Sequence, residues 1–170
     1  AVASACERLV TRGGAEGLVV RTKDNRILKI KPEITIDAAV VGYAQSPRGV
    51  GELLLALIRD DGGFQLIGRV RTGWSRVEQG DLCARLESLH RASTFRKVSD
   101  HGTLVRWVKP ELVVEVKCND LISANSKDEP IRRMRLEYRD NPGWSPVRPT
   151  SSVSMINAVF LRSREDKRAV

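Results

Sequence analysis

Short apolar runs bounded by turn residues dominate the hydrophobic pattern of the chain, and most of them have the length of β-strands. Residues 53–58 are consecutive apolar residues, as in a fully buried strand, and the turn residues 60–63 follow closely. Residues 64–71 then alternate, with Phe64, Leu66, Gly68 and Val70 on one face and Gln65, Ile67, Arg69 and Arg71 on the other. The pattern predicts a β-hairpin over residues 52–71.

Similar signals predict strands in other parts of the chain, namely residues 17–22, 27–32, 37–43, 104–117, 131–138 and 154–161. A turn is expected at residues 23–26 and a loop at residues 46–51. Pro110 marks an edge or a bulge in its strand, and Gly68 marks a sharp bend of the kind that small closed barrels need. A proline-rich stretch with Pro142, Pro146 and Pro149 separates the last two strands.

Helical spacing is found in two places. Residues 2–10 predict one short helix at the start of the chain. In the second helix Asp81 is the expected N-cap, and Leu82, Leu86 and Leu89 fall on one face. We interpret this leucine stripe as core and assign it no further role.

The order of these elements predicts a mainly β chain: an OB-fold barrel with one inserted helix, over residues 42–170. Residues 1–41 hold a helix and three strands, which is too little surface for an independent core. We therefore expect this first segment to be a helix-and-strand remnant of another domain.

The composition favours an acidic partner. Of the 170 residues 41% are hydrophobic, and 29 Lys and Arg exceed 21 Asp and Glu to give a net charge of +8. Such a basic balance is typical of nucleic-acid binding. Cys6, Cys83 and Cys118 are widely spaced and form no Cys-x-x-Cys pair, which disfavours a zinc site or disulfides and favours a reducing compartment.

No apolar run approaches the ~18 residues of a membrane span, and the first residues lack the pattern of a signal peptide. The expected location is therefore intracellular, in the cytoplasm or nucleoid, with no membrane partner.

Candidate chemistry lies near the start of the chain. Glu16 precedes the strand at residues 17–22, and Lys29 and Lys31 lie two apart on the next strand. Residues two apart in a strand project to the same face, so both lysines can meet one anion such as a polyphosphate. A carboxylate beside them suits a hard cation. This combination is typical of phosphoryl chemistry, where catalysis is mostly positioning and charge neutralisation.

These residues resemble motifs IV and V of the nucleotidyltransferases that become covalently adenylylated. Residues 37–42 are similar to the link into the OB domain of ATP-dependent DNA ligases, and residues 68–75 to their Gly-x-Val-x-Thr-Gly-Phe-Ser/Thr stretch. Residues 107–116 resemble the Trp-Val-x-Pro-x-Leu-Val-x-Glu-Val strand of these ligases, and residues 160–167 resemble motif VI. The matches follow one another in the family's order, and the resemblance spans nearly everything from residue 6 to residue 167.

The resemblance implies that a lysine attacks the α-phosphate of ATP, that AMP passes to the 5′-phosphate of a nick, and that the 3′-hydroxyl then seals the strand. It implies that Glu16 binds Mg²⁺ and that Lys29 and Lys31 contact the nucleotide phosphates. It also implies that four residues of motif VI orient the ATP pyrophosphate: Arg162, Arg164, Asp166 and Lys167.

The expected nucleic-acid partner is nicked duplex DNA. A basic surface for its backbone is predicted from seven residues: Arg69, Arg71, Arg106, Lys109, Arg132, Arg133 and Arg135. Any one of these side chains is equally compatible with an ordinary exposed residue. Trp74 and Trp107 are expected to anchor the core or a loop instead of stacking on bases.

The chain lacks two motifs of the family. It contains no Lys-x-Asp-Gly, the motif that carries the nucleophile, and it contains no motif III. It therefore resembles the C-terminal part of a ligase, in which residues 1–41 end the adenylylation domain. Its expected partner is the missing N-terminal adenylylation half, without which it is inactive. Two alternatives remain: a non-catalytic OB-fold module that binds nucleic acid, and a relative of RNA ligases or capping enzymes. Residues 72–75 and 107–111 favour a DNA ligase.

Overall fold

The computed structural model describes residues 1–169 in two compact units, one from Ala1 to Ile34 and one that begins at Thr35. The division lies within the first residues of a strand, β3 (Ile34–Ser46). The domain boundary predicted between residues 41 and 42 lies further along this strand. The assignment of the first segment to an adenylylation domain stays a prediction.

The first unit is a short helix followed by a hairpin. Helix α1 (Val2–Cys6) continues into a π-helical turn, η1 (Glu7–Thr11), over the segment predicted to be helical. Strands β1 (Leu18–Arg21) and β2 (Ile27–Ile30) pair antiparallel. Val10 is the one buried residue among those described in this unit, and apolar side chains such as Val19 are exposed. The expectation that this segment cannot form a core of its own agrees with these exposures.

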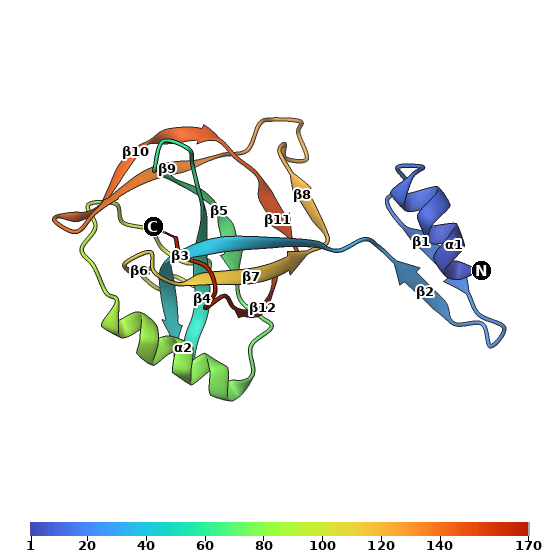
Figure 1. Ribbon diagram of the computed structural model, residues 1–170, viewed down its shortest axis with the longest axis horizontal. Coiled ribbons are helices and arrows are strands. Elements are labelled where there is room, and N and C mark those ends of the chain that lie inside the picture. Colours follow the sequence, from blue (N-terminus) through green and yellow to red (C-terminus); the bar gives the residue numbers. More distant parts are fainter. Residues whose placement is uncertain (170) are drawn as a thin grey trace. The chain divides into compact units, whose positions relative to one another are not determined.

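The second unit is built on one large, strongly curled sheet (Figure 1). Its strands are ordered β10-β9-β5-β4-β3-β7-β12, and β6 pairs with β3. Besides β3 they are β4 (Gly49–Ile58), β5 (Phe64–Val70), β6 (Arg106–Trp107), β7 (Val113–Cys118), β9 (Arg132–Arg139), β10 (Gly143–Ser151) and β12 (Val159–Ser163). A separate two-stranded sheet joins β8 (Asp120–Ile122) to β11 (Ser154–Ile156). The mainly β prediction is confirmed.

The curl brings the chain after β5 back to β12. The backbone N–H of Phe160 donates to the carbonyl of Thr72 at 2.8 Å, which links the two ends of the path β5-β4-β3-β7-β12. Gly73 makes this approach possible, because a Cβ there would lie 2.1 Å from the carbonyl oxygen of Phe160, and its φ is +113°. The bend predicted at Gly68 agrees with its φ of +146°.

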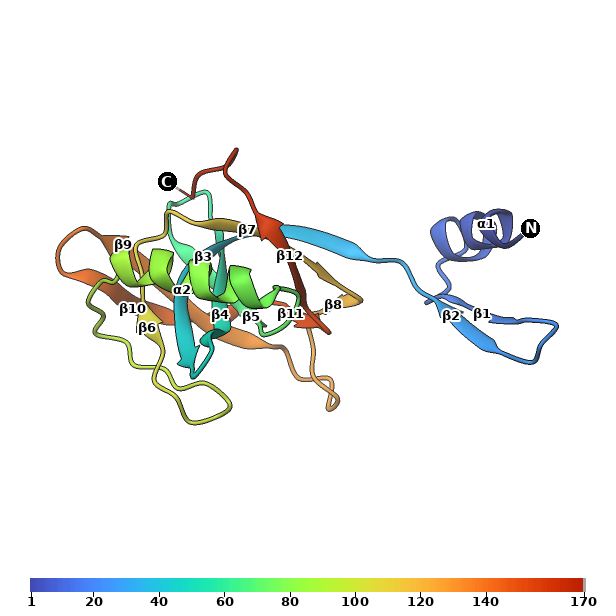
Figure 2. The same ribbon diagram turned by 90° about the horizontal axis from the view of Figure 1, so that it is seen from below.

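One long helix, α2 (Arg76–Ser88), packs against β4 (Figure 2). Its N-cap is Ser75, so the prediction of Asp81 as the cap is wrong. Ser75 accepts a hydrogen bond from the N–H of Glu78, and the Glu78 carboxylate accepts one from the N–H of Ser75. This reciprocal pair satisfies two free backbone donors, which Asp81 cannot do from inside the helix. Leu82 and Leu86 of the predicted stripe are buried.

Two apolar clusters cover opposite faces of the sheet, as the alternation along β3 and β4 requires. Val40 and Leu55 belong to the cluster that includes α2, while Val41 and Leu54 belong to the other. The second cluster is rich in aromatic side chains, and Trp144 at its centre donates from Nε1 to the carbonyl of Val108 at 2.8 Å.

The two tryptophans expected to be anchors have that role. Trp107 is buried in the second cluster, and its ring centroid lies 5.9 Å from that of Trp144. Trp74 is partly buried and packs against Phe160 with ring centroids 5.8 Å apart.

Two predictions about the central hairpins are wrong. The loop expected at residues 46–51 is a two-residue turn, because β3 runs to Ser46 and β4 begins at Gly49. The alternation expected over residues 64–71 inverts at a bulge between the pairs Leu55↔Gly68 and Ala56↔Leu66. Val70 therefore packs in the same cluster as Ile67, on the face opposite Phe64 and Leu66.

Three predictions about the later strands also need correction. The strand expected over residues 104–117 is divided into β6 and β7 at a turn that contains Pro110. The strand expected over residues 154–161 is divided into β11 and β12 at Asn157, whose φ is +53°. Most of the proline-rich stretch is itself a strand: β10 lies at the end of the sheet beside β9, and an edge strand tolerates Pro146 and Pro149.

Candidate functional site

The first unit contains the three residues predicted to bind Mg²⁺ and the nucleotide phosphates, and two of them are in contact. The ammonium of Lys31 pairs with the carboxylate of Glu16, and this contact holds the pKa of Glu16 below its ordinary value. Lys31 follows β2 and lies beside Gly17, which explains why it reaches Glu16 across the hairpin. Lys29 is exposed on β2. Glu16 and Lys31 thus form a charge pair that an incoming phosphate or cation would have to rearrange.

A metal ion at Glu16 would need further ligands. Within residues 1–169 no three His, Cys, Asp or Glu side chains lie close enough together to hold a metal ion. Mg²⁺ in nucleotide sites is commonly bound by one or two carboxylates, with phosphates and water completing its shell. A single carboxylate at Glu16 fits that pattern of binding.

The four residues predicted to orient the ATP pyrophosphate lie together in the second unit: Arg162 at the end of β12, and Arg164, Asp166 and Lys167 just after it. Arg164 is at the centre of this group. Its Nη1 donates to both oxygens of Asp37 at 2.9 and 3.1 Å, and its Nε and Nη2 donate to Asp166 at 2.8 and 2.7 Å. Lys167 pairs with the same Asp37. These contacts lower the pKa of both aspartates and raise the pKa of Arg164.

Acidic side chains from the sheet and the helix hold the rest of the segment. Arg162 donates from Nε to Glu115 of β7 at 2.6 Å, and Nη1 of Arg164 lies 3.8 Å from the same carboxylate. Glu165 accepts two hydrogen bonds from Arg85 of α2, at 2.5 and 3.3 Å. No sequence pattern identifies Asp37, Glu115 or Arg85 as partners, because these contacts join residues far apart along the chain.

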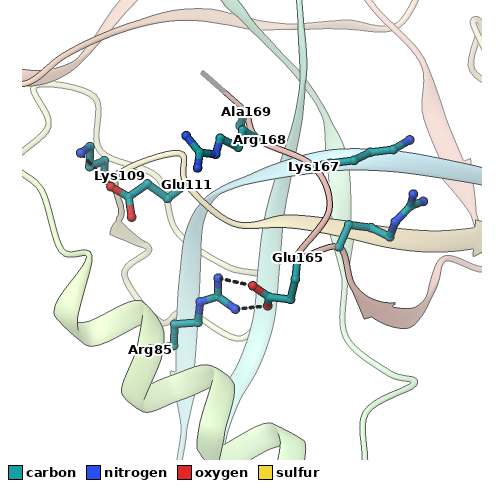
Figure 3. A pocket seen from close by; sticks show the side chains of 8 residues that line it. Arg85, Lys109, Glu111, Glu165, Lys167, Arg168 and Ala169 are labelled. Carbon is teal, nitrogen blue, oxygen red and sulfur yellow. Dashed lines mark hydrogen bonds and ion pairs between the residues drawn. The ribbon is translucent and has the colours of Figure 1, made fainter.

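A cavity of about 470 Å³ opens beside this segment. Figure 3 shows the Arg85–Glu165 pair at one edge, with the side chain of Arg168 extending toward Lys109 and Glu111. Lys109 and Glu111 themselves form an ion pair at 2.7 Å. The lining carries five cations and two carboxylates: Arg85, Lys109, Arg164, Lys167 and Arg168, with Glu111 and Glu165. Its net positive charge suits an anionic ligand.

Three of the seven predicted DNA-binding residues line a second cavity, of about 370 Å³. They are Arg69 of β5, Arg71 just beyond it and Arg133 of β9. Asp100 bridges the first two, at 2.6 Å from Arg69 and 3.0 Å from Arg71. Glu52 of β4, which is 2% exposed, lies behind them and accepts a hydrogen bond from Arg69 at 3.3 Å.

The other four predicted DNA-binding residues lie outside this cavity. Arg106 pairs with Glu87 of α2 at 3.6 Å, and Lys109 lines the first cavity. Arg135 is held by Asp61 at 3.3 Å, with its side chain 18% exposed. Arg132 is exposed on β9. The structure therefore distributes the seven residues among several places on the second unit.

A search of the helices in residues 1–169 finds none that is both long and apolar enough to cross a membrane.

Comparison with known proteins gives consistent matches. Residues 46–167 match the family described as the ATP dependent DNA ligase C terminal region. DNA ligase C1 of Mycolicibacterium smegmatis is 27% identical, over 82% of this chain and 43% of the relative. The multifunctional non-homologous end joining DNA repair protein LigD of Mycobacterium tuberculosis is 32% identical, over 71% of this chain and 17% of the relative.

Among solved structures, the ligase domain of M. tuberculosis LigD superposes with a TM-score of 0.55 and 26% identity. The match covers 97% of this chain and 48% of that one. The chain therefore spans less than half of the length of each of these relatives.

Proposed function

The chain belongs to the family of C-terminal regions of ATP-dependent DNA ligases, and we propose that it acts as this part of a ligase that seals nicks in duplex DNA. In this proposal it works with an adenylylation domain that carries the nucleophilic lysine. That lysine attacks the α-phosphate of ATP and releases pyrophosphate. The AMP then moves to the 5′-phosphate of the nick, and the 3′-hydroxyl displaces it as the strand is joined.

The observation that carries this proposal is the charged group at the end of β12 and just after it. Arg162, Arg164 and Lys167 lie together, in a segment whose sequence resembles motif VI. Arg164 is fixed from two sides by Asp37 and Asp166, so its position is defined before any ligand arrives. A fixed guanidinium suits a pyrophosphate leaving group, because planar N–H pairs match phosphate oxygens in geometry and charge.

Arg164 and Lys167 would exchange the carboxylate of Asp37 for phosphate oxygens when they meet the nucleotide. Asp166 would keep its hold on the Nε side of Arg164 during this exchange, so the guanidinium stays oriented. The two lysines of the first unit, Lys29 and Lys31, would contact the nucleotide phosphates.

Mg²⁺, when bound, would offset the negative charge that the phosphates bring together. Glu16 is the residue of this chain proposed to hold it. Lys31 would then leave the carboxylate of Glu16 and bind phosphate, so that each charge of the pair finds a new partner.

Nicked duplex DNA is the proposed substrate, and the basic residues of the second unit are its proposed contacts. Contacts of this type bind the backbone without reading the sequence, and they weaken with salt. DNA ligases must act at any nick, so binding through phosphates suits this activity.

The test uses the ligase formed by this chain and an adenylylation domain with an intact Lys-x-Asp-Gly motif. With α-labelled ATP, the Arg164→Ala variant should form the covalent AMP adduct at least ~10-fold more slowly, since its contact is needed at the pyrophosphate. The same variant should still seal a nick that is already adenylylated. Arg48→Ala, which alters an exposed arginine in the turn between β3 and β4, is the matched control.

Equal rates for Arg164→Ala and Arg48→Ala would contradict the proposed role of the segment. A second arm incubates the chain alone with labelled ATP, where we expect no covalent label. A label would mean that a lysine of this chain is itself a nucleophile. Binding of nicked DNA without any contribution to adenylylation would instead indicate a non-catalytic OB-fold module.

A further inference from the structure

Three cations line the second cavity, and a fourth cation, beside two of them, was not predicted from the sequence. Lys97 lies in the irregular segment between α2 and β6, close enough to Arg69 and Arg133 that their charges act on its ammonium. Arg69, Arg71 and Arg133 line the cavity itself, together with Thr72 and Ser154. We name this group of Arg69, Arg71, Lys97 and Arg133 the Lys97 cluster.

The cluster has more positive charge than its surroundings neutralise. Asp100 and Glu52 pair with Arg69 and Arg71. Within residues 1–169, neither Lys97 nor Arg133 forms an ion pair with a carboxylate; Arg133 donates to neutral oxygens, the carbonyl of Val153 at 3.2 Å and Oγ of Ser154 at 2.8 Å. The charges of Glu52 and Asp100 also act on Lys97, so four cations share two carboxylates and the cluster has two positive charges in excess.

The charges of Lys97 and Arg133 are also partly removed from water. Burial, followed by the charge of Arg69, lowers the pKa of Lys97 and of Arg133 below their ordinary values. Like charges that are held together in a half-buried position cost free energy, and a bound anion would offset that cost. The neutral donors Thr72 and Ser154 at the same cavity would add hydrogen bonds to such an anion.

We propose that the Lys97 cluster binds one phosphate group of the DNA backbone, with Lys97 and Arg133 as the residues that neutralise it. This inference rests on the proposed function, and it refines the seven predicted contacts to one site of defined composition. The cavity of about 370 Å³ has room for a single phosphodiester group with its sugars outside. Arg69 and Arg71, already paired with acids, would donate their remaining N–H groups to it.

The experiment measures binding of a labelled nicked duplex to this chain, in which single backbone phosphates are replaced one at a time by neutral methylphosphonates. For the unmodified chain we expect one position where replacement weakens binding several-fold. Lys97→Ala and Arg133→Ala should each bind the unmodified duplex more weakly. In these variants, the methylphosphonate at that position should not lower the affinity further. The slope of log K against log salt should fall by about one in each variant.

Arg96→Ala is the matched control, because Arg96 is exposed and precedes Lys97 in the same segment. It should keep the sensitivity of the unmodified chain at every phosphate. Arg133→Lys should retain most of the affinity, which separates loss of charge from loss of folding. Thermal melting of each variant checks that the second unit is folded.

The outcomes separate this inference from the proposed function. If the unmodified chain does not bind the nicked duplex, the proposed function fails and the inference fails with it. If the chain binds but Lys97→Ala and Arg133→Ala behave like Arg96→Ala, the inference alone is overturned. If inorganic phosphate binds to the cluster, yet no methylphosphonate position is linked to Lys97 and Arg133, the site takes a free anion and the assignment to the DNA backbone is overturned.

Discussion

Arg164 and Asp37 are joined by two hydrogen bonds, 2.9 and 3.1 Å long, although 127 positions separate them in the chain. Asp37 lies near the start of β3, and Arg164 follows the last strand, β12. Lys167 adds a second cation to the same carboxylate. One acidic residue at the beginning of the second unit therefore fixes the segment that ends it.

Asp37→Asn should lower the melting temperature of the second unit by a few degrees at pH 7, because it removes the charge that both cations share. The contacts lower the pKa of Asp37 in the folded state below the ordinary aspartate value of about 3.9. A lowered pKa stabilises the fold above the unfolded value, and this stabilisation is lost as the pH falls through the folded value. The melting temperatures of the variant and the unmodified chain should therefore become equal as the pH falls below about 4.

Thermal melts at a series of pH values measure this difference, and Asp60→Asn, at an exposed turn, is the control. All three tryptophans, Trp74, Trp107 and Trp144, lie in the second unit, so their fluorescence reports that unit by itself. A difference that stays constant down to pH 2 would rule out the ion pair as its cause.

Ser75→Ala should destabilise the second unit by about 1 kcal/mol, because it removes the cap of α2. Asp81→Ala, the cap expected from the sequence, should change the free energy of unfolding by no more than about 0.5 kcal/mol. Urea unfolding followed by tryptophan fluorescence gives both values. The reverse ranking would place the start of the helix at Asp81 after all.

Gly73→Ala should destabilise the fold by about 2–4 kcal/mol, since it combines a strained φ with a collision against the backbone of Phe160. Gly80→Ala is a matched control in α2, where a Cβ meets nothing within 4 Å. That change should stabilise the protein by about 0.5–1 kcal/mol through helix propensity. Denaturation midpoints that shift in the same direction for both variants would disprove the close approach at Gly73.

Leu86→Ala should cost about 2–5 kcal/mol, because Leu86 is fully buried between α2 and the sheet. Val77→Ala removes an apolar side chain from the same helix, but Val77 is 72% exposed. Its effect should stay within about 0.5 kcal/mol. The free energies of unfolding in urea distinguish the two, and similar losses for both would mean that α2 does not pack on the sheet through Leu86.

Periodicity predicted the strands well where each face of the sheet is uniform, and failed where the backbone is irregular. The run at residues 53–58 lies within β4 as expected. Val70 was wrongly placed on the face of Phe64 and Leu66, because one bulged residue inverts the alternation that follows it. Pro146 and Pro149 suggested a break between two strands, since sequence alone does not reveal that their own strand lies at an edge. The cap at Ser75 was within reach, because Ser-x-x-Glu is a sequence signature of a helix start.

The candidate site was predicted from the sequence as a set of cations, and its acidic partners were not. Arg164 was expected from its motif, whereas Asp37 and Glu115 were found only when the fold brought them to it. Lys97 lies in an irregular segment without periodicity, so no pattern distinguishes it from other lysines. These acidic partners reach the cations only because the curled sheet brings distant parts of the chain together, and no local sequence pattern predicts that arrangement.

The prolines of β10 have a consequence for how copies of this protein meet. β10 ends the strand order of the sheet, and among the described residues its outer edge is bridged only near its start, where Trp144 meets Ser93. The rest of this edge could template a strand from another molecule. Pro146 and Pro149 have no backbone N–H, and the bulge beside Pro146 interrupts the regular spacing of the edge. An incoming strand would find an incomplete row of donors there. The edge is thereby protected against the sheet-to-sheet association that begins many aggregates.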